Sequence, residues 1–264
     1  MSVEEKDWIF VSDAHFTGKD PAEMESFLRF LDSEQERMGH LVILGDLFEF
    51  FFGFRQSSSS REKSFAFPEY LPVLEHLQRL YHHGIRIKYF EGNHDFFLRD
   101  LFTEQFGMKV EVYSEGVEEG LGERKAFIAH GDLSNPGQWK YRVFRKILKN
   151  RWTYAMIHLA GPRITRRVAA RLGETSYRNY HATVSLTPPP VFRSFAERKF
   201  SEGFDLVILG HSHVAEEVSE WVGGRRCLYF NVGAWRDGRS FLRFTPPDRF
   251  ELSRFMDDSR EIGR

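Results

Sequence analysis

Short apolar runs of strand length alternate, in the first half of this chain, with longer segments whose apolar residues recur every three or four positions. The short runs predict strands at 8–12, 40–44, 85–90, 109–113 and 124–129. The longer segments predict helices near 21–38, 69–83 and 97–106, and the run from Ser57 to Ser60 predicts a loop.

The last third of the chain has a different pattern. A helix near 189–202, which begins with prolines, leads to a strand at 205–209. Only strand-like runs follow, at 216–222, 226–231, 240–244 and 250–255. Together with the first half, this order predicts an α/β fold of two packed sheets flanked by helices, a layered α/β/β/α sandwich.

Residues 136–186 interrupt the pattern. Large apolar residues recur there at helical spacing with basic residues between them: Trp139, Val143, Phe144, Ile147, Leu148 and Trp152. A second helical stretch is expected at 162–172. We therefore predict a core made of 1–135 and 187–264, with 136–186 inserted as a basic amphipathic helical cap.

Charge separates this segment from the rest. The net charge is −1, yet the stretch from Trp139 to Arg171 holds ten basic residues and no acidic one. A cationic segment on an otherwise acidic protein favours an anionic partner, such as phosphate groups, an acidic membrane surface or nucleic acid. The 27 phenylalanines either pack the core or line a pocket for lipid.

The single cysteine, Cys227, excludes an internal disulfide and lies in an apolar run, so we expect a buried, inert thiol and a reducing cytoplasm. No apolar run reaches the roughly 18 residues that a membrane span needs. We expect neither a signal peptide nor a transmembrane helix.

Five predicted strands run into polar turns, IFVSDAH, LVILGDLFE, IKYFEGNHD, AFIAHGD and LVILGHSH. These turns carry one set of candidate metal ligands: Asp13, His15, Asp46, Asn93, His130, His211 and His213. Glycine beside several of them allows backbone and side chains to crowd around an ion. Asp13 and His15 are two apart, as are His211 and His213, so each pair would share a face of an extended strand.

Such a set suits two ions. Asp46 has two carboxylate oxygens and can bridge, while the Asn93 amide adds a ligand without adding negative charge. Two ions about 3.5–4 Å apart bind both ends of an in-line displacement at phosphorus and generate hydroxide near neutral pH. Four imidazoles in a mixed nitrogen and oxygen set favour Mn²⁺, Fe or Zn²⁺ over Mg²⁺, and we expect two Mn²⁺ ions.

In this order, D-A-H, G-D, G-N-H-D, H-G-D and G-H-S-H resemble the five signature blocks of the calcineurin-like metallophosphoesterases. The resemblance implies that Asp13, His15, Asp46 and His213 hold one ion. It implies that Asp46, Asn93, His130 and His211 hold the other. A lone D-x-H or H-x-H motif would indicate little, because a single histidine is more often an ordinary surface or core residue.

The same resemblance implies that His94 contacts the phosphate and protonates the leaving oxygen, although a structural role is the alternative. A partnered imidazole would be held cationic, as an acid must be. Glu49 or Asp95 is the candidate partner, and either residue has the alternative of capping a helix. The expected catalytic residues are His94, Asp46 and Glu49.

Within that superfamily, GDLFEFFFG, GNHDFFL and HGD followed by Tyr141 and Phe144-Arg145 resemble the UDP-2,3-diacylglucosamine pyrophosphatases of lipid A synthesis. These enzymes release UMP and 2,3-diacylglucosamine 1-phosphate, with acyl chains held under a helical insertion. The likeness extends nearly end to end. The chain departs from that pattern at His94, where arginine is common, at Gln138, where an acid is common, and at Ala182, where lysine is common.

The resemblance leads us to expect a lipid-linked nucleotide substrate that contacts Asn93, His94, Tyr141, Arg145, Asn179 and His211. Tyr141 and Arg145 are four apart and would share a helix face, where a solvated basic face is the alternative. The Phe50 to Phe54 run would border an acyl channel or simply pack beneath its loop. Trp235 would help to close the site or be buried.

Three other functions remain open. A non-enzymatic scaffold of this fold, binding protein or membrane, should have lost ligands, whereas all seven are present. A nuclease would use the ten cations along a phosphate backbone, but the large apolar residues between them favour lipid. Hydrolysis of another nucleotide diphosphate or phosphodiester is the strongest competitor. We expect a cytoplasmic enzyme, and an anionic inner membrane is the surface that it would contact peripherally; its oligomeric state stays open.

Overall fold

A computed structural model describes residues 6–53, 67–161 and 189–257, together with residues 164, 165, 167, 168 and 171. Its six-stranded sheet has the order β13-β12-β1-β2-β4-β6 and its five-stranded sheet the order β10-β11-β9-β8-β7. The strands of the first sheet are β1 (Asp7–Val11), β2 (Met38–Ile43), β4 (Arg86–Phe90), β6 (Glu111–Tyr113), β12 (Ser240–Thr245) and β13 (Arg249–Arg254). The second contains β7 (Val117–Leu121), β8 (Arg124–Ile128), β9 (Leu206–Leu209), β10 (Glu216–Val222) and β11 (Arg225–Asn231).

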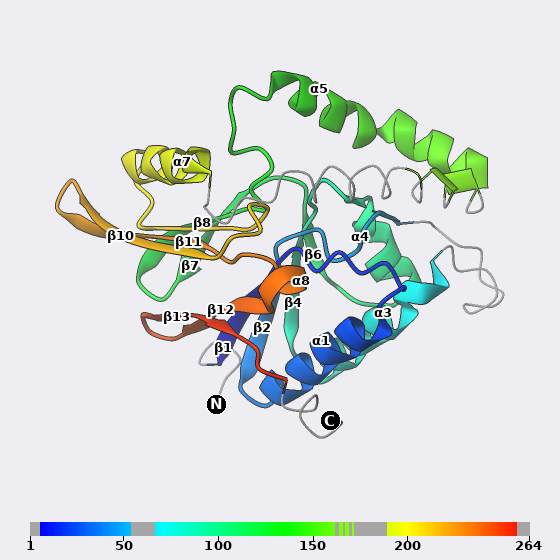
Figure 1. Ribbon diagram of the computed structural model, residues 1–264, viewed down its shortest axis with the longest axis horizontal. Helices are drawn as coiled ribbons and strands as arrows, with labels where there is room; N and C mark the ends of the chain where they lie inside the picture. The colour runs from blue at the N-terminus through cyan, green and yellow to red at the C-terminus, as the bar shows by residue number, and fades with distance from the viewer. Residues whose placement is uncertain are drawn as a thin grey trace.

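Helices cover the outer faces of the two sheets (Figure 1). Helices α1 (Pro21–Glu34) and α3 (Leu71–His82) pack on the six-stranded sheet, and α7 (Pro190–Ser201) packs on the five-stranded one. The remaining short elements are β3 (Phe51–Phe52), η2 (Pro68–Tyr70), β5 (Asp95–Phe96), α4 (Leu98–Asp100), η3 (Leu101–Gln105) and α8 (Trp235–Gly238). The predicted α/β/β/α sandwich is therefore confirmed.

Alternation along the central strands explains the layers. In β1, Ile9 and Val11 face the helices, whereas Trp8 and Phe10 belong to the core between the two sheets. Residues of α7 and the outer face of the second sheet form a third buried cluster. Burial of both sheet faces accounts for the almost continuous apolar runs that predicted these strands.

Parallel pairing sets the position of the polar turns. Strands β1, β2 and β4 run parallel in one sheet, and β8 and β9 run parallel in the other. Their carboxyl ends lie at the same end of the sandwich, and the loops that follow them meet there. The backbone N–H of Gly210 donates to the carbonyl of His130 across 2.8 Å, which joins two of these loops directly.

Helix α5 (Trp139–Leu148) and the helical residues 151–161 lie beyond this end of the sandwich, at the top of Figure 1. Leu148 and Ile157 pack against the main core, whereas Trp152 and Leu159 are 77% and 90% exposed. Most of the predicted second helical stretch falls outside the described residues, as do Asn179, Ala182, Phe54 and the serine run.

Several expectations need correction. Strand β7, the two short strands β3 and β5, and helix α8 were not predicted, and α1 ends at Glu34 instead of extending to 38. Strand β7 reads VEEGL and alternates between half-exposed and exposed residues along most of its length. It therefore lacks the apolar run that identified the buried strands.

The structure shows how the aromatic residues after the Asp46 loop pack. Phe51 and Phe52 are buried, and Phe51 packs against Phe48, Phe67 and Tyr70. Packing beneath the loop thus describes Phe51 and Phe52, and an acyl channel bordered by this run stays a prediction. Trp235 is fully buried among Phe27, Phe30 and Phe255, and Cys227 is buried as expected.

Candidate metal centre

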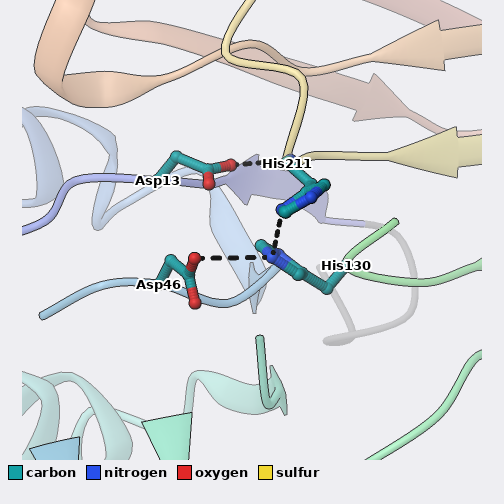
Figure 2. A group of neighbouring side chains, drawn as sticks. All are labelled: Asp13, Asp46, His130 and His211. Carbon is teal, nitrogen blue, oxygen red and sulfur yellow. Dashed lines mark hydrogen bonds and ion pairs between the residues drawn. The ribbon is translucent and has the colours of Figure 1, made fainter. Parts of the chain in front are cut away.

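The structure brings all seven predicted ligands together at the carboxyl ends of the central strands. One group contains Asp13, Asp46, His130 and His211, and another contains Asp13, His15 and His213; within each group the ligand atoms lie within 4.8 Å of one another. Figure 2 shows Asp13, Asp46, His130 and His211 converging from four loops. Asn93 joins this set, with its Oδ1 3.2 Å from His130 Nε2.

Distances place Asp46 in the middle. Its Oδ2 lies 4.0 Å from Nε2 of His15 and 3.5 Å from Nε2 of His130. Its Oδ1 accepts the backbone N–H of His94 at 2.9 Å. One oxygen of Asp46 therefore faces both groups, which is the arrangement that the predicted bridge requires.

Backbone conformation, more than strand alternation, directs these side chains. Asp13, His15, Asp46, His211 and His213 all have positive φ angles, between 48° and 66°. Residues other than glycine adopt this left-handed conformation at an energetic cost, which is typical of functional sites. The expectation that Asp13 and His15, or His211 and His213, share a face of an extended strand is wrong, because each pair lies in a tight turn beyond its strand.

Two glycines make room for the ligands. A Cβ atom on Gly92 would lie 2.1 Å from Asp46 Oδ1, and one on Gly210 would lie 2.0 Å from the Ser12 hydroxyl. Neither contact is sterically possible without displacing a ligand or its neighbour. This crowding agrees with the expected role of glycine beside the ligands.

The carboxylates of the centre favour positive charge on the neighbouring histidines. Burial opposes protonation of His15, but hydrogen bonds to Asp13 and Glu49 and the charge of Asp46 outweigh it and raise the pKa of His15 to about 10. Burial likewise opposes a charge on His213, yet the Asp13 carboxylate and the hydrogen bonds to Asp13 and Asp237 raise its pKa to about 9. The carboxylates thus create a site that attracts cations.

The donor set fits divalent metal ions. Asp13 Oδ1 is buried and lies 3.3 Å from His213 Nε2 and 3.7 Å from His15 Nε2. Ring nitrogens also face each other, with His130 Nε2 3.1 Å from His211 Nδ1 and His15 Nε2 3.3 Å from His213 Nε2. Two ring nitrogens this close are suited either to share one proton or to bind the same cation. Asp13, Asp46, Asn93 and the four histidines would hold such ions.

His94 lies beside this centre but is not arranged as expected. Its Nδ1 hydrogen-bonds to the backbone carbonyl of Glu49, while the Glu49 carboxylate is 3.8 Å away. Burial lowers the pKa of His94 and so disfavours the charged ring, although the charges of Asp46 and Glu49 oppose this effect; the expected role of His94 as a cationic acid stays a prediction. Asp95 is not its partner either, because the Asp95 side chain accepts the backbone N–H of Asp46 at 2.6 Å.

Glu49 occupies a position between two histidines. Its Oε2 is 3.4 Å from His15 Nδ1 and 3.5 Å from the Arg236 guanidinium. Glu49 is therefore a neighbour of His15 that supports the metal ligands, and a catalytic role stays a prediction.

Asp95 also lies beside this centre. Burial and the neighbouring Asp46 charge raise the pKa of Asp95 to about 8.

The predicted substrate contacts on α5 lie close to the centre. Arg145 is 8% exposed, and its Nε is 2.6 Å from Asp132 Oδ2, which also accepts the Tyr141 hydroxyl at 2.5 Å. The solvent-facing alternative is thus wrong for Arg145. Contact of Tyr141 and Arg145 with substrate stays a prediction, and Asn179 lies outside the described residues.

Sequence reasoning missed several neighbours of the ligands. Asp237 Oδ2 lies 3.1 Å from His213 Nδ1, and the Asn231 amide donates to the carbonyl of Gly210 at 2.9 Å. Both come from NVGAWRDG, which no metal-ligand spacing distinguishes from an ordinary strand and turn. Asp132 belongs to the HGD motif, but its bonds to α5 depend on tertiary packing.

Comparison with known proteins assigns this centre to a class. The sequence model of the Calcineurin-like phosphoesterase family matches residues 9–215, a range that contains all seven predicted ligands. The chain belongs to this family and is an enzyme of the dinuclear metallophosphoesterase type, with divalent metal ions as its cofactors.

Relatives named UDP-2,3-diacylglucosamine hydrolase are similar over most of the chain. The Tolumonas auensis protein is 28% identical over 78% of this chain and 79% of its own length. The Coxiella burnetii protein (strain RSA 331) is 26% identical over 95% of this chain and 98% of its own. Among solved structures, Chaetomium thermophilum Vps29 aligns at a TM-score of 0.44 and 11% identity, over 90% of this chain and 80% of that one.

Proposed function

We propose that this enzyme hydrolyses UDP-2,3-diacylglucosamine to UMP and 2,3-diacylglucosamine 1-phosphate. The observation that carries the proposal is the position of α5. This helix combines cations with large apolar side chains, and two of its residues, Tyr141 and Arg145, reach Asp132 two positions from the ligand His130. Relatives bearing that activity in their names align across this helix as well as across the metal loops.

The chemistry follows from the centre. Bound divalent ions would polarise the diphosphate and lower the pKa of a water molecule. The water oxygen forms a bond to phosphorus while the bridging P–O bond breaks, so that UMP and the lipid phosphate separate. Asp13, Asp46, Asn93 and the four histidines would hold the ions, and we propose Mn²⁺ because the donor set mixes nitrogen and oxygen.

His94 would orient the phosphate. A carbonyl only accepts, so the Nδ1 of His94 carries the proton that is donated to Glu49, and a neutral ring leaves Nε2 as an acceptor. With its pKa lowered by burial, the ring is suited to hold a water molecule or a protonated phosphate oxygen. Protonation of the leaving oxygen by His94 would require the ring to gain a proton first.

A second part of the proposal concerns the membrane. Exposed apolar side chains gather on α5 and the helical residues after it: Trp139, Phe144, Ile147, Trp152, Met156 and Leu159. Basic residues lie between them, and no acidic residue occurs from Trp139 to Arg171. This surface, the α5 apolar face, would contact an anionic bilayer on the cytoplasmic side, where the lipid substrate resides. Among the described residues, no helix is long and apolar enough to cross a membrane.

The test is product identification by mass spectrometry. Purified protein with Mn²⁺ is incubated with UDP-2,3-diacylglucosamine, with other nucleotide diphosphate sugars and with an aryl phosphodiester. UMP and the lipid 1-phosphate are the expected products. Cleavage of the aryl phosphodiester without turnover of the lipid nucleotide would leave the class intact and disprove this substrate.

A further inference from the structure

Two buried ion pairs, one from α5 and one from Lys149 directly after it, join this helix to the metal-binding end of the sandwich. Lys149 Nζ lies 3.2 Å from Glu91 Oε2, with side chains 9% and 8% exposed. Arg145 Nε lies 2.6 Å from Asp132 Oδ2, with side chains 9% and 3% exposed. Removing one partner of such a pair leaves a buried charge uncompensated, so each pair strongly favours the position that the helix now has.

The partners on the core side are neighbours of metal ligands. Glu91 directly follows β4 and precedes Asn93 by two residues, whereas Asp132 follows His130 by two. Arg145 also donates to the backbone carbonyls of Glu91 and Ser114, at 3.2 and 2.6 Å. One helix is therefore tied to both loops that carry Asn93 and His130.

The loops that carry Glu91 and Asp132 are held in place by hydrogen bonds that do not involve α5. The backbone N–H of Glu91 donates to the backbone carbonyl of Tyr113 at 2.8 Å, and Glu91 Oε1 accepts the backbone N–H of Leu98 at 2.9 Å. The N–H of Ser134 closes the other loop onto Gly131 at 3.0 Å. The helix side has fewer apolar contacts: Val143, Phe144 and Ile147 of α5 are about half exposed or more, and among its large apolar residues Leu148 packs against the main core. Polar contacts with the core, such as the bond from Arg142 to the Leu133 carbonyl at 2.6 Å, hold most of the helix in place. Loss of a pair should therefore release the helix and leave the metal loops in place.

We propose that Glu91 and Asp132 are positioning residues that hold α5 in a fixed register above the metal centre, so that the enzyme binds substrates with a large second group. This proposal rests on the proposed function, in which α5 contacts the lipid nucleotide. Small phosphodiesters need only the metal centre and should not depend on the two pairs.

The first experiment measures the helix itself by hydrogen–deuterium exchange of peptides covering residues 139–149. Lys149→Met keeps an unbranched chain that is one atom shorter and removes the charge. Lys149→Arg is the conservative variant, and Lys146→Met removes an exposed cation from the same helix. We expect exchange about tenfold faster in Lys149→Met and within about twofold of wild type in the other two. Unchanged exchange in Lys149→Met would overturn the proposal.

The second experiment separates positioning from general stability. In Lys149→Met, KM for UDP-2,3-diacylglucosamine should rise about tenfold, with kcat and the hydrolysis of an aryl phosphodiester each within about threefold of wild type. An equal loss of both activities would show a merely structural role and overturn the proposal.

A third variant keeps the test independent of the substrate assignment. Should the wild-type enzyme cleave aryl phosphodiesters but not the lipid nucleotide, the proposed function fails, and exchange in a double-mutant cycle decides the role of the pair. Adding Glu91→Gln to Lys149→Met should increase exchange by less than about twofold, because the pair is already broken. Fully additive effects would overturn the link between the two residues.

Discussion

Asp46 is the residue on which both halves of the metal centre depend. Its Oδ2 faces His15 and His130, so Asp46→Asn should weaken both metal positions at once. Loss of Lewis-acid stabilisation worth several kcal/mol predicts a fall in kcat of at least about 100-fold on an aryl phosphodiester. The Asn oxygen can still accept the His94 N–H, so thermal unfolding of the metal-free protein should change little. Near-normal turnover would contradict the bridging role.

A substitution at Gly92 tests whether steric crowding holds the Asp46 carboxylate in place. Gly92→Ala would place a Cβ 2.1 Å from Asp46 Oδ1 and should lower kcat/KM by at least about tenfold through displacement of a ligand. Gly120→Ala is the matched control, because nothing lies within 4 Å of its added Cβ. Steady-state kinetics and metal titration of both variants provide the measurement, and equal behaviour of the two would exclude the steric argument.

At the scale of elements, the α5 apolar face makes a prediction about membranes. Trp152→Ser removes a side chain that is 77% exposed, and burial of such a side chain in a bilayer is worth about 2 kcal/mol. Binding to vesicles containing anionic lipid should therefore weaken about tenfold or more. Trp221→Ser is the control, since Trp221 is 74% exposed on β10, away from α5. Co-sedimentation with anionic and neutral vesicles measures the effect; equal losses for both variants would argue against this surface.

Elements also differ in how well sequence pattern reveals them. The central strands and helices α1, α3 and α7 are long, apolar on at least one face and bounded by turns, so their existence was predictable. Short elements such as β5 and α8 depend on tertiary contacts instead. Phe51 pairs with Asp95 in register, a contact between residues far apart in sequence that no local pattern encodes.

At the scale of the whole molecule, packing between strands β1 and β2 predicts how stability depends on pH. His40 is 3% exposed and stacks on Trp8 with ring centroids 3.8 Å apart. Burial, with the charges of Arg86 and Lys88 outweighing that of Glu111, lowers its pKa to about 4. His40 therefore becomes protonated near pH 6.5 in the unfolded chain but only near pH 4 in the folded chain. The free energy of unfolding consequently falls as the pH falls from about 6.5 to about 4.

The size of the effect follows from the same shift. His40 alone should make the protein about 2 kcal/mol less stable at pH 5 than at pH 7. Denaturant unfolding at both pH values measures it. His40→Phe should keep the ring stack and remove this part of the pH dependence, whereas His82→Gln, at an exposed histidine, should not. An unchanged pH dependence in His40→Phe would disprove the assignment.

The sequence by itself determined the layered fold, the seven candidate ligands and the class of chemistry. These properties are local, because strand ends, turn residues and ligand types are encoded within a few neighbouring positions. Only the tertiary structure decided that left-handed turns direct Asp13 and His15, that the ring of His94 hydrogen-bonds to a backbone carbonyl, and that α5 is tied to Glu91 and Asp132. Burial and charge at those residues depend on partners that are distant in sequence, and such partners meet only when the chain is packed.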